Sequence, residues 1–412
     1  MPISLRAAIM AGALLSAGQS VFAQELTLEG AVAKAAEATP LLRAGEAGVA
    51  AARAGRRQAD VRPNPVVIIE GENLVGSGRY GVLGQAEITA TYSQPIERGG
   101  KRAARVTLAD RDIGVAEASA RVARLELASA VERAFLDVVI ADYVAQIADT
   151  RLGIELEMQR EALRRVRGYK DPLFVETRAA ARVAQARIGV SAASTRQRSS
   201  RAALAAFWGE SGEALTIKGD LLTGVPATSR IAAADLALAE ATTARAAAAV
   251  TVEETRRIQD YTVSGGARFL RGTNDIAAVA GITIPLGRFD RNQGAIERAQ
   301  AERLRIELTA EAARLDRLRR LASLGADAAA ARVQAQAIVT EVYPRTTKAL
   351  QQVRVGYARG GFSFRDMQDA ADAILRAQDE WLEAITRYRD LQTEIDRLTG
   401  RFDVSRPLET RP

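Results

Sequence analysis

The chain of 412 residues contains no cysteine and no histidine, and its formal net charge of +7 comes almost entirely from arginine. These absences exclude disulfide bonds, thiolate and imidazole metal sites, and catalysis by a Cys–His or Ser–His pair. Arginine is interspersed with Glu and Asp and no nucleic-acid-binding motif is present, so the basic balance indicates solvated helix faces and no nucleic-acid partner.

The first 23 residues have the pattern of a secretory signal peptide. Arg6 precedes a short apolar run, and Val21 and Ala23 occupy the positions before a cleavage site. We therefore expect residues 1–23 to be a signal peptide and the mature chain to start near Gln24. No later segment has the roughly 18 uninterrupted apolar residues of a membrane-spanning helix.

Two pairs of similar segments recur at a spacing of about 190 residues, which predicts a twofold internal repeat. Ile88–Arg102 is similar to Val279–Gly294, and the turn at Gly168 is similar to the turn at Gly356. Each copy is expected to hold a helix, a β-hairpin, a long helix, a tip turn and a final helix. The predicted copies are residues 24–226, with hairpin 66–95 and tip turn 168–174, and residues 227–412, with hairpin 261–286 and tip turn 356–364.

Each copy begins with an Ala-rich helix, predicted over Leu28–Val61 and over Ile231–Arg257. The extended segments that follow alternate in polarity; Ile88, Ala90 and Tyr92 share one face and polar residues the other. A run of about ten such residues crosses a bilayer as a tilted strand. The same alternation suits half-buried hairpins of a soluble domain, so alternation alone leaves both interpretations open.

The stretch VGSGRYGVLG, residues 75–84, contains the spacing G-x-G-x-x-G with Glu97 about twenty residues on, as in a dinucleotide site. Such a site needs a helix that begins at the glycines. Here an alternating strand follows instead, and Pro95 is expected to end it. The stretch is therefore predicted to be the outward-facing loop of the first hairpin.

The longest predicted helix runs from Lys101 to Tyr169 without a proline and would be roughly 100 Å long. A second long helix starts near Gln293 and should be kinked or divided by Pro344. Helices of this length must pack along one another, as in a coiled coil or a helical cylinder.

The four predicted strands are too few to close a barrel, because outer-membrane barrels need about eight or more. Lipid does not tolerate unclosed sheet edges, so if these strands span a membrane, several chains must pool them. Three copies give twelve strands, which points to a trimeric outer-membrane tunnel.

Four stretches carry a resemblance to a known family: VRPNPVVIIEGENLVGSG, YSQPIERGGKR, GITIPLGRFDRNQGAIERA and the segment from Gly356 to Gly400. Through them the sequence resembles the TolC-like outer-membrane efflux proteins. It looks most like the outer-membrane components of cobalt–zinc–cadmium type resistance-nodulation-division (RND) pumps.

This resemblance implies a mainly α fold with a small transmembrane β part. It implies a homotrimer with a twelve-stranded β-barrel, four strands per chain, in outer-membrane lipid and a long α-helical barrel in the periplasm. A periplasmic adaptor protein and an inner-membrane RND pump would be its partners. The chain would conduct divalent heavy-metal cations passively, without catalysis, cofactor or bound metal.

The resemblance also implies roles for residues near the two tip turns. Asp366 and Asp369, with Asp372 as a weaker third member, would form acidic rings that narrow the tunnel. Early-helix aspartates also simply suit the helix dipole. Tyr357 would help to close the tip, with Arg359 or Arg365 replacing an arginine for which this chain has Phe362. The predicted adaptor-docking residues of the tip turns are Gly168, Tyr169, Gly356, Gly360 and Gly361.

Two alternatives to a heavy-metal channel stay open at this point. One is a TolC-like channel for organic drugs or type I secretion. The other is a periplasmic coiled-coil adaptor or scaffold, which would not need two amphipathic hairpins. An enzyme has no support, because no convergent acid–base or nucleophile set is present.

Overall fold

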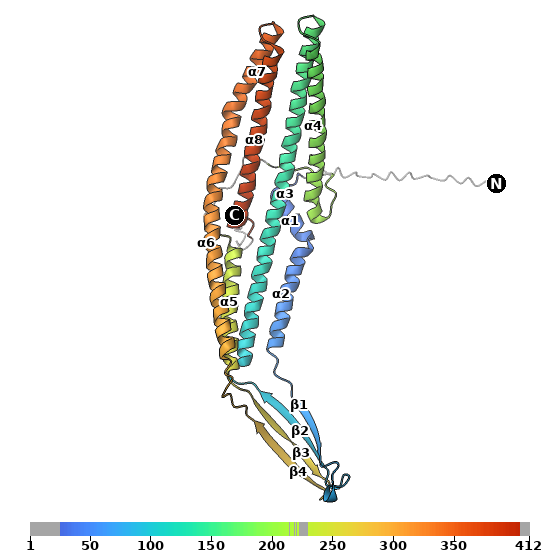
Figure 1. The fold of residues 1–412 in the computed structure, drawn as a ribbon, viewed down its shortest axis with the longest axis vertical. Helices are drawn as coiled ribbons and strands as arrows, with labels where there is room; N and C mark the ends of the chain where they lie inside the picture. The colour runs from blue at the N-terminus through green and yellow to red at the C-terminus, as the bar shows by residue number, and fades with distance from the viewer. Residues whose placement is uncertain (1–24, 214, 218, 220, 222–229, 404–412) are drawn as a thin grey trace, which may run out of the picture.

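The computed structural model describes residues 25–213, 215–217, 219, 221 and 230–403. Long helices run side by side along most of the molecule, and a four-stranded sheet extends from one end of them (Figure 1). The predicted signal peptide, residues 1–23, lies outside the described residues.

The first helical segment consists of two helices, α1 (Leu28–Ala38) and α2 (Pro40–Ala59). The prediction of one helix over Leu28–Val61 was therefore wrong. Pro40 has no N–H to donate back into α1, and the Thr39 hydroxyl caps α2 by accepting a hydrogen bond from Leu41 N at 3.3 Å.

Four long helical segments form two antiparallel pairs, and α5 packs against α3 and α6 (Figure 1). In the first pair α3 runs unbroken for 67 residues and α4 returns beside it. In the second pair α6 passes through a single π-helical turn, η3, into α7, and α8 returns. The bounds are α3 Lys101–Arg167, α4 Phe174–Ala205, α5 Ala233–Arg256, α6 Gln293–Ala337, η3 Ile338–Val342, α7 Tyr343–Ala358 and α8 Phe364–Thr399; Ala206–Trp208 form a short 3-10 turn, η2.

The sheet contains β1 (Val66–Glu72), β2 (Glu87–Ile96), β3 (Tyr261–Leu270) and β4 (Asp275–Thr283), all antiparallel, in the order β1-β2-β3-β4. The glycine-rich stretch lies between β1 and β2, as predicted, and holds the 3-10 turn η1 (Gly78–Tyr80). The strand β2 continues one residue past the predicted end at Pro95. Beyond Ser93 it pairs with β3 but no longer with β1, so this part of β2 is an edge of the sheet, and an edge strand tolerates a proline.

The register of the sheet gathers apolar side chains on one face of all four strands. Ile69 pairs with Ala90, Ala90 with Ala267, and Ala267 with Ala278, so these four residues form one row across the sheet. The same exposed face also holds Val67, Ile88, Tyr92, Val263, Phe269, Ile276 and Ile282.

Polar side chains gather on the other face, which is the more buried one. Thr89 and Ser93 are buried there. Arg268 donates to Thr89 Oγ1 and to Glu87 Oε2, both at 2.9 Å, and lies 3.3 Å from Glu72. An apolar exposed face and a polar inner face are the reverse of a soluble protein and are typical of a strand that faces lipid.

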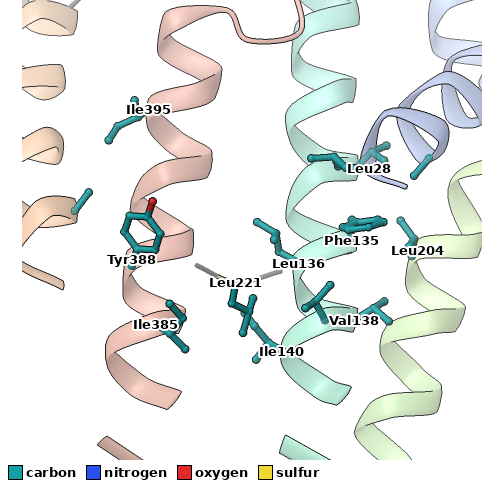
Figure 2. Packing of buried hydrophobic residues seen from close by; sticks show 14 of the residues in the cluster. Leu28, Phe135, Leu136, Val138, Ile140, Leu204, Leu221, Ile385, Tyr388 and Ile395 are labelled. Carbon is teal, nitrogen blue, oxygen red and sulfur yellow. The ribbon is translucent and has the colours of Figure 1, made fainter. Parts of the chain in front are cut away.

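The main core lies at mid-length, where α3 and α8 face each other with α1 and α4 at one side (Figure 2). Leu136 and Ile140 of α3 approach Ile385 and Tyr388 of α8. A second, smaller core lies near the turns at the far end from the sheet. Among the described residues, no helix has both the length and the apolar character needed to cross a membrane.

Candidate gate at the helical tip

The end of the helices opposite the sheet is called the tip here, and it consists of residues 168–174, between α3 and α4, and residues 356–364, where α7 turns into α8 (Figure 1). Gly168 ends α3, and its N–H donates to Arg164 O at 3.2 Å. Tyr169 follows in the left-handed region with φ 55, and its side chain is 98% exposed.

The second turn depends on two glycines. Gly360 adopts φ +85, which other residues rarely reach. At Gly356 a Cβ would lie 2.2 Å from the Phe362 ring, so only glycine lets this ring pack against the last turn of α7. Phe362 therefore acts as a packing residue of the turn. Gly361 closes the turn through its N–H, which donates to Gly356 O at 2.9 Å.

Tyr357 is fully buried and joins the two helix pairs. Its hydroxyl donates to the carboxylate of Asp171. Arg165 donates to the two oxygens of that carboxylate at 3.0 and 2.9 Å, and to Tyr357 O at 2.9 Å. The Arg165 guanidinium also lies 4.5 Å from the centre of the Tyr357 ring. We call Arg165, Asp171 and Tyr357 the tip network.

The tip network has a definite charge state. The hydrogen bonds from Arg165 lower the pKa of Asp171 below its ordinary value, and the Tyr357 hydroxyl acts in the same direction. Burial, together with the bond to Asp171, raises the pKa of Tyr357. Asp171 is therefore ionised and Tyr357 is protonated at neutral pH, which matches the direction of the hydrogen bond between them.

The three predicted acidic residues have different surroundings in the structure. Asp366 forms a capping box with Ser363: it accepts from Ser363 N at 2.8 Å, and its own N–H donates to Ser363 Oγ at 3.2 Å. The bonds from the Ser363 hydroxyl and N–H lower the pKa of Asp366. Asp369 is 71% exposed, with Arg365 at 4.0 Å as an ion-pair partner.

The Asp372 carboxylate is paired with an arginine of the same chain. It accepts from Arg182 of α4, whose guanidinium also donates to both oxygens of the buried Glu155 of α3 at 3.0 Å. One arginine thus holds a carboxylate from α3 and a carboxylate from α8. Asp366 and Asp369 are therefore the exposed members of the three, and Asp369 is not part of the capping box.

Sequence reasoning singled out Tyr357 but not the residues that contact it. The structure places Arg165 and Asp171 against Tyr357, whereas Arg365 lies near Asp369 and Arg359 is exposed at the end of α7. Arg165 and Asp171 flank the first turn six residues apart, and spacing across a turn does not predict an ion pair. The contact with Tyr357 spans 192 residues and has no local signal.

In the part of the chain that the structure describes, no group of three or more acidic residues could hold a metal ion. The acidic side chains of the tip instead accept hydrogen bonds from arginine, serine and tyrosine. The arrangement can hold two helix pairs together and can present charge to solvent.

Comparisons with known proteins agree with this architecture. The sequence profile of the family described as "Outer membrane efflux protein" matches residues 31–210. The chain is 32% identical over 386 residues to the cobalt-zinc-cadmium resistance protein CzcC of Cupriavidus metallidurans, covering 91% of this chain and 90% of that protein. The chain belongs to the outer membrane efflux protein family.

Two further relatives agree with this membership. The nickel-cobalt-cadmium resistance protein NccC of Alcaligenes xylosoxydans xylosoxydans is 29% identical over 301 residues, which cover 72% of this chain and 68% of that protein. The outer membrane protein VceC of Vibrio cholerae has the same fold, with a TM-score of 0.72, 18% identity and coverage of 90% of this chain and 96% of that chain.

This outer membrane efflux protein is a channel component and not an enzyme. It is located in the outer membrane, and proteins of this family extend from there into the periplasm. The sheet, with its apolar outer face, is the part suited to lipid, and the helices carry the tip network into the periplasm.

Proposed function

We propose that three copies of this chain form the outer-membrane channel of a tripartite RND-type efflux pump that expels divalent heavy-metal cations. The similarity to a cobalt-zinc-cadmium resistance protein over nine-tenths of both chains is the observation that carries this proposal. The channel is passive, and the inner-membrane pump supplies the energy.

The open sheet supports the trimer. The strands β1 and β4 each have a neighbour on one side only, so a single chain leaves two rows of backbone groups unpaired. Unpaired backbone groups cost several kcal/mol each in lipid, so the edges must be paired by further copies. Three copies give a twelve-stranded barrel whose polar face, with Arg268 and Glu87, lines the lumen.

The tip has a surface suited to an adaptor protein. Besides Tyr169, large apolar side chains are exposed there: Leu173 is 70% exposed and Phe174 63% exposed, and Phe362 is nearly half exposed. Exposed apolar side chains gathered at one end of an elongated protein are typical of an interaction site. We propose that the glycine-bearing tip turns dock to a periplasmic adaptor, which connects this channel to the pump.

Growth of a deletion strain in the native host tests the proposed substrate. Loss of the gene should reduce tolerance of at least one of cobalt, zinc, cadmium, nickel and copper, and the wild-type gene on a plasmid should restore it. Tolerance of organic dyes and antibiotics serves as the comparison. Unchanged metal tolerance in a strain that becomes sensitive to organic compounds would replace the metal proposal with a drug channel.

A further inference from the structure

A small pocket lies where α6 passes into α7, on the side that faces α3 and α8. It has a volume of about 240 Å³. Its walls come from three places: Ile147 and Tyr143 of α3, Ile338 and Tyr343 at the π-helical turn, and Gln378 and Trp381 of α8. This pocket is remote from the tip network, and the proposed transport function does not use it.

The backbone at the junction explains why there is space. The turn η3 is π-helical over five residues, and Pro344 follows at the second position of α7. A proline inside a helix removes a hydrogen bond and bends the helix. Here Thr346 Oγ1 donates to Val342 O at 3.1 Å and Thr347 Oγ1 donates to Tyr343 O at 2.8 Å, so side chains bond to carbonyls of the bent segment. The junction is therefore irregular in its backbone and is reinforced by side-chain hydrogen bonds.

Two polar atoms of the pocket walls have no hydrogen-bond partner among the described residues. They are Nε1 of Trp381, which is a donor, and Oε1 of Gln378, which is an acceptor. Gln378 is only 9% exposed, and its amide nitrogen is 3.5 Å from the Tyr343 hydroxyl. Leaving such atoms unpaired in a protein interior destabilises the fold, because they lose their hydrogen bonds to water. In native proteins, buried polar atoms without a protein partner are mainly hydrogen-bonded to a ligand or to water.

The rest of the wall is apolar and aromatic. The rings of Tyr143 and Trp381 pack edge to face, with their centres 5.4 Å apart. No charged side chain lines the pocket. The pocket therefore excludes ionised ligands and metal cations, because nothing in its wall would compensate a buried charge.

We infer that this pocket binds a small neutral molecule with an aromatic or short aliphatic body and one hydroxyl group. A cavity of about 150 Å³ in another protein holds benzene, so 240 Å³ has room for one ring with a substituent but not for a drug-sized molecule. One hydroxyl can accept from Trp381 and donate to Gln378 at the same time, which satisfies both unpaired atoms. Phenol is the simplest probe of this class, and toluene is its counterpart without a hydroxyl.

Tryptophan fluorescence provides a local readout, because the chain has only two tryptophans, Trp208 and Trp381. In a Trp208→Phe variant, purified in amphipol to avoid detergent in the pocket, all tryptophan emission comes from Trp381. Phenol should change this emission in a saturable way and raise the melting temperature. Toluene should bind about 10-fold more weakly, since it forms neither hydrogen bond.

Two variants separate specific binding from general partitioning. Gln378→Leu, made in the Trp208→Phe background, keeps the size of the side chain but removes the acceptor. It should weaken phenol binding several-fold and leave toluene binding unchanged. In the converse Trp381→Phe variant, emission from Trp208 should not respond to phenol.

The inference is overturned if folded Trp208→Phe protein shows no saturable response to phenol. It is also overturned if phenol and toluene bind equally and Gln378→Leu changes neither, because the unpaired atoms then recognise nothing but water. Circular dichroism establishes that each variant is folded before either result is interpreted.

Discussion

At the scale of single residues, Tyr357 provides the most direct test of the tip. Tyr357→Phe removes the hydroxyl that donates to Asp171 but keeps the ring beside Arg165. A hydrogen bond to a charged group contributes about 1.5–3 kcal/mol, so we expect a roughly 10- to 100-fold shift toward a loosened tip. Planar bilayer recordings should show a higher conductance or open probability.

Tyr169→Phe is the matched control for this measurement. Tyr169 also lies at the tip, but its side chain is almost completely exposed, so loss of its hydroxyl should leave the recordings unchanged. Equal behaviour of the two variants would contradict the role of the tip network in holding the helix pairs together.

Asp369 is exposed, and unlike Asp366 it is not part of a capping box, so it is the simplest test of the acidic charges proposed to narrow the tunnel. A unit charge about 4 Å from a cation in water contributes about 1 kcal/mol, so Asp369→Asn should weaken block by divalent cations several-fold. Asp366→Ala with Asp369→Ala should weaken block further and raise conductance. Because Asp366 also caps α8, its substitution alone should lower the melting temperature as well.

Asp372→Asn is the comparison for the acidic residues. Its charge is already paired with Arg182, so its loss should affect block less than the loss of Asp369. Block that is insensitive to all three substitutions would exclude these aspartates from the conducting path.

At the scale of elements, a buried carboxyl pair connects α3 to the end of α8. Nη1 of Arg401 lies 3.3 Å from Glu132 of α3 and 2.8 Å from Asp396 of α8. Gln392 donates to the second oxygen of Asp396 at 2.7 Å, and Arg389 and Glu29 are the other charged groups nearby. Burial, and then repulsion from Asp396, raises the pKa of Glu132 to about 8.

This raised pKa predicts how stability depends on pH. Between the ordinary pKa of a glutamate and about 8, the folded chain binds more protons at Glu132 than the unfolded chain. Stability should therefore fall as the pH rises through this window. Glu132→Gln carries a permanently neutral side chain and should reduce the fall in melting temperature between pH 5 and pH 9 by a few degrees.

Glu117→Gln is the control, because Glu117 lies on the same helix but in an exposed ion pair with Arg53. This variant should keep the pH dependence of the wild type. If the melting temperature of Glu132→Gln falls with pH as much as that of the wild type, Glu132 does not carry the proposed proton.

The elements differ in how well the sequence predicts them. The helix α3 was predicted closely, because 67 residues without a proline have a clear local signal. The break at Thr39 was missed although Pro40 is a local signal, since an Ala-rich pattern continues on both sides. The tip network could not be predicted, because Arg165 and Tyr357 meet only through the packing of two helix pairs.

At the scale of the whole molecule, the proposed trimer can be tested with introduced thiols, since the natural chain has no cysteine. Ile69 on β1 and Ala278 on β4 lie in the same row on the two edge strands. The test combines Ile69→Cys with Ala278→Cys, or with a cysteine at a neighbouring β4 position on the same face. A short bifunctional thiol reagent should then join the chains into a covalent trimer. Denaturing gels measure its size.

The pair Ile69→Cys and Ala90→Cys is the control, because these residues are neighbours within one chain. It should react without any increase in mass. Edge-strand pairs that give only monomers in membranes would show that β1 and β4 do not meet between copies.

The order of the elements supports the internal repeat. Each half of the described chain has a helical segment, two strands, a long helix and a returning helix in the same order, so we propose that one unit was duplicated. The number of strands per chain follows from the structure directly. Closure requires at least two chains, and the proposed number of three rests on the resemblance to TolC-like channels.

The tip network has a consequence for how such a trimer would open. Arg165, Asp171 and Tyr357 all belong to one chain, so each copy carries its own complete lock. Three independent locks give four combinations, from all closed to all released. Opening would then proceed in discrete steps, and trimers that mix wild-type and Tyr357→Phe chains should populate intermediate current levels in proportion to the binomial distribution of the two chains.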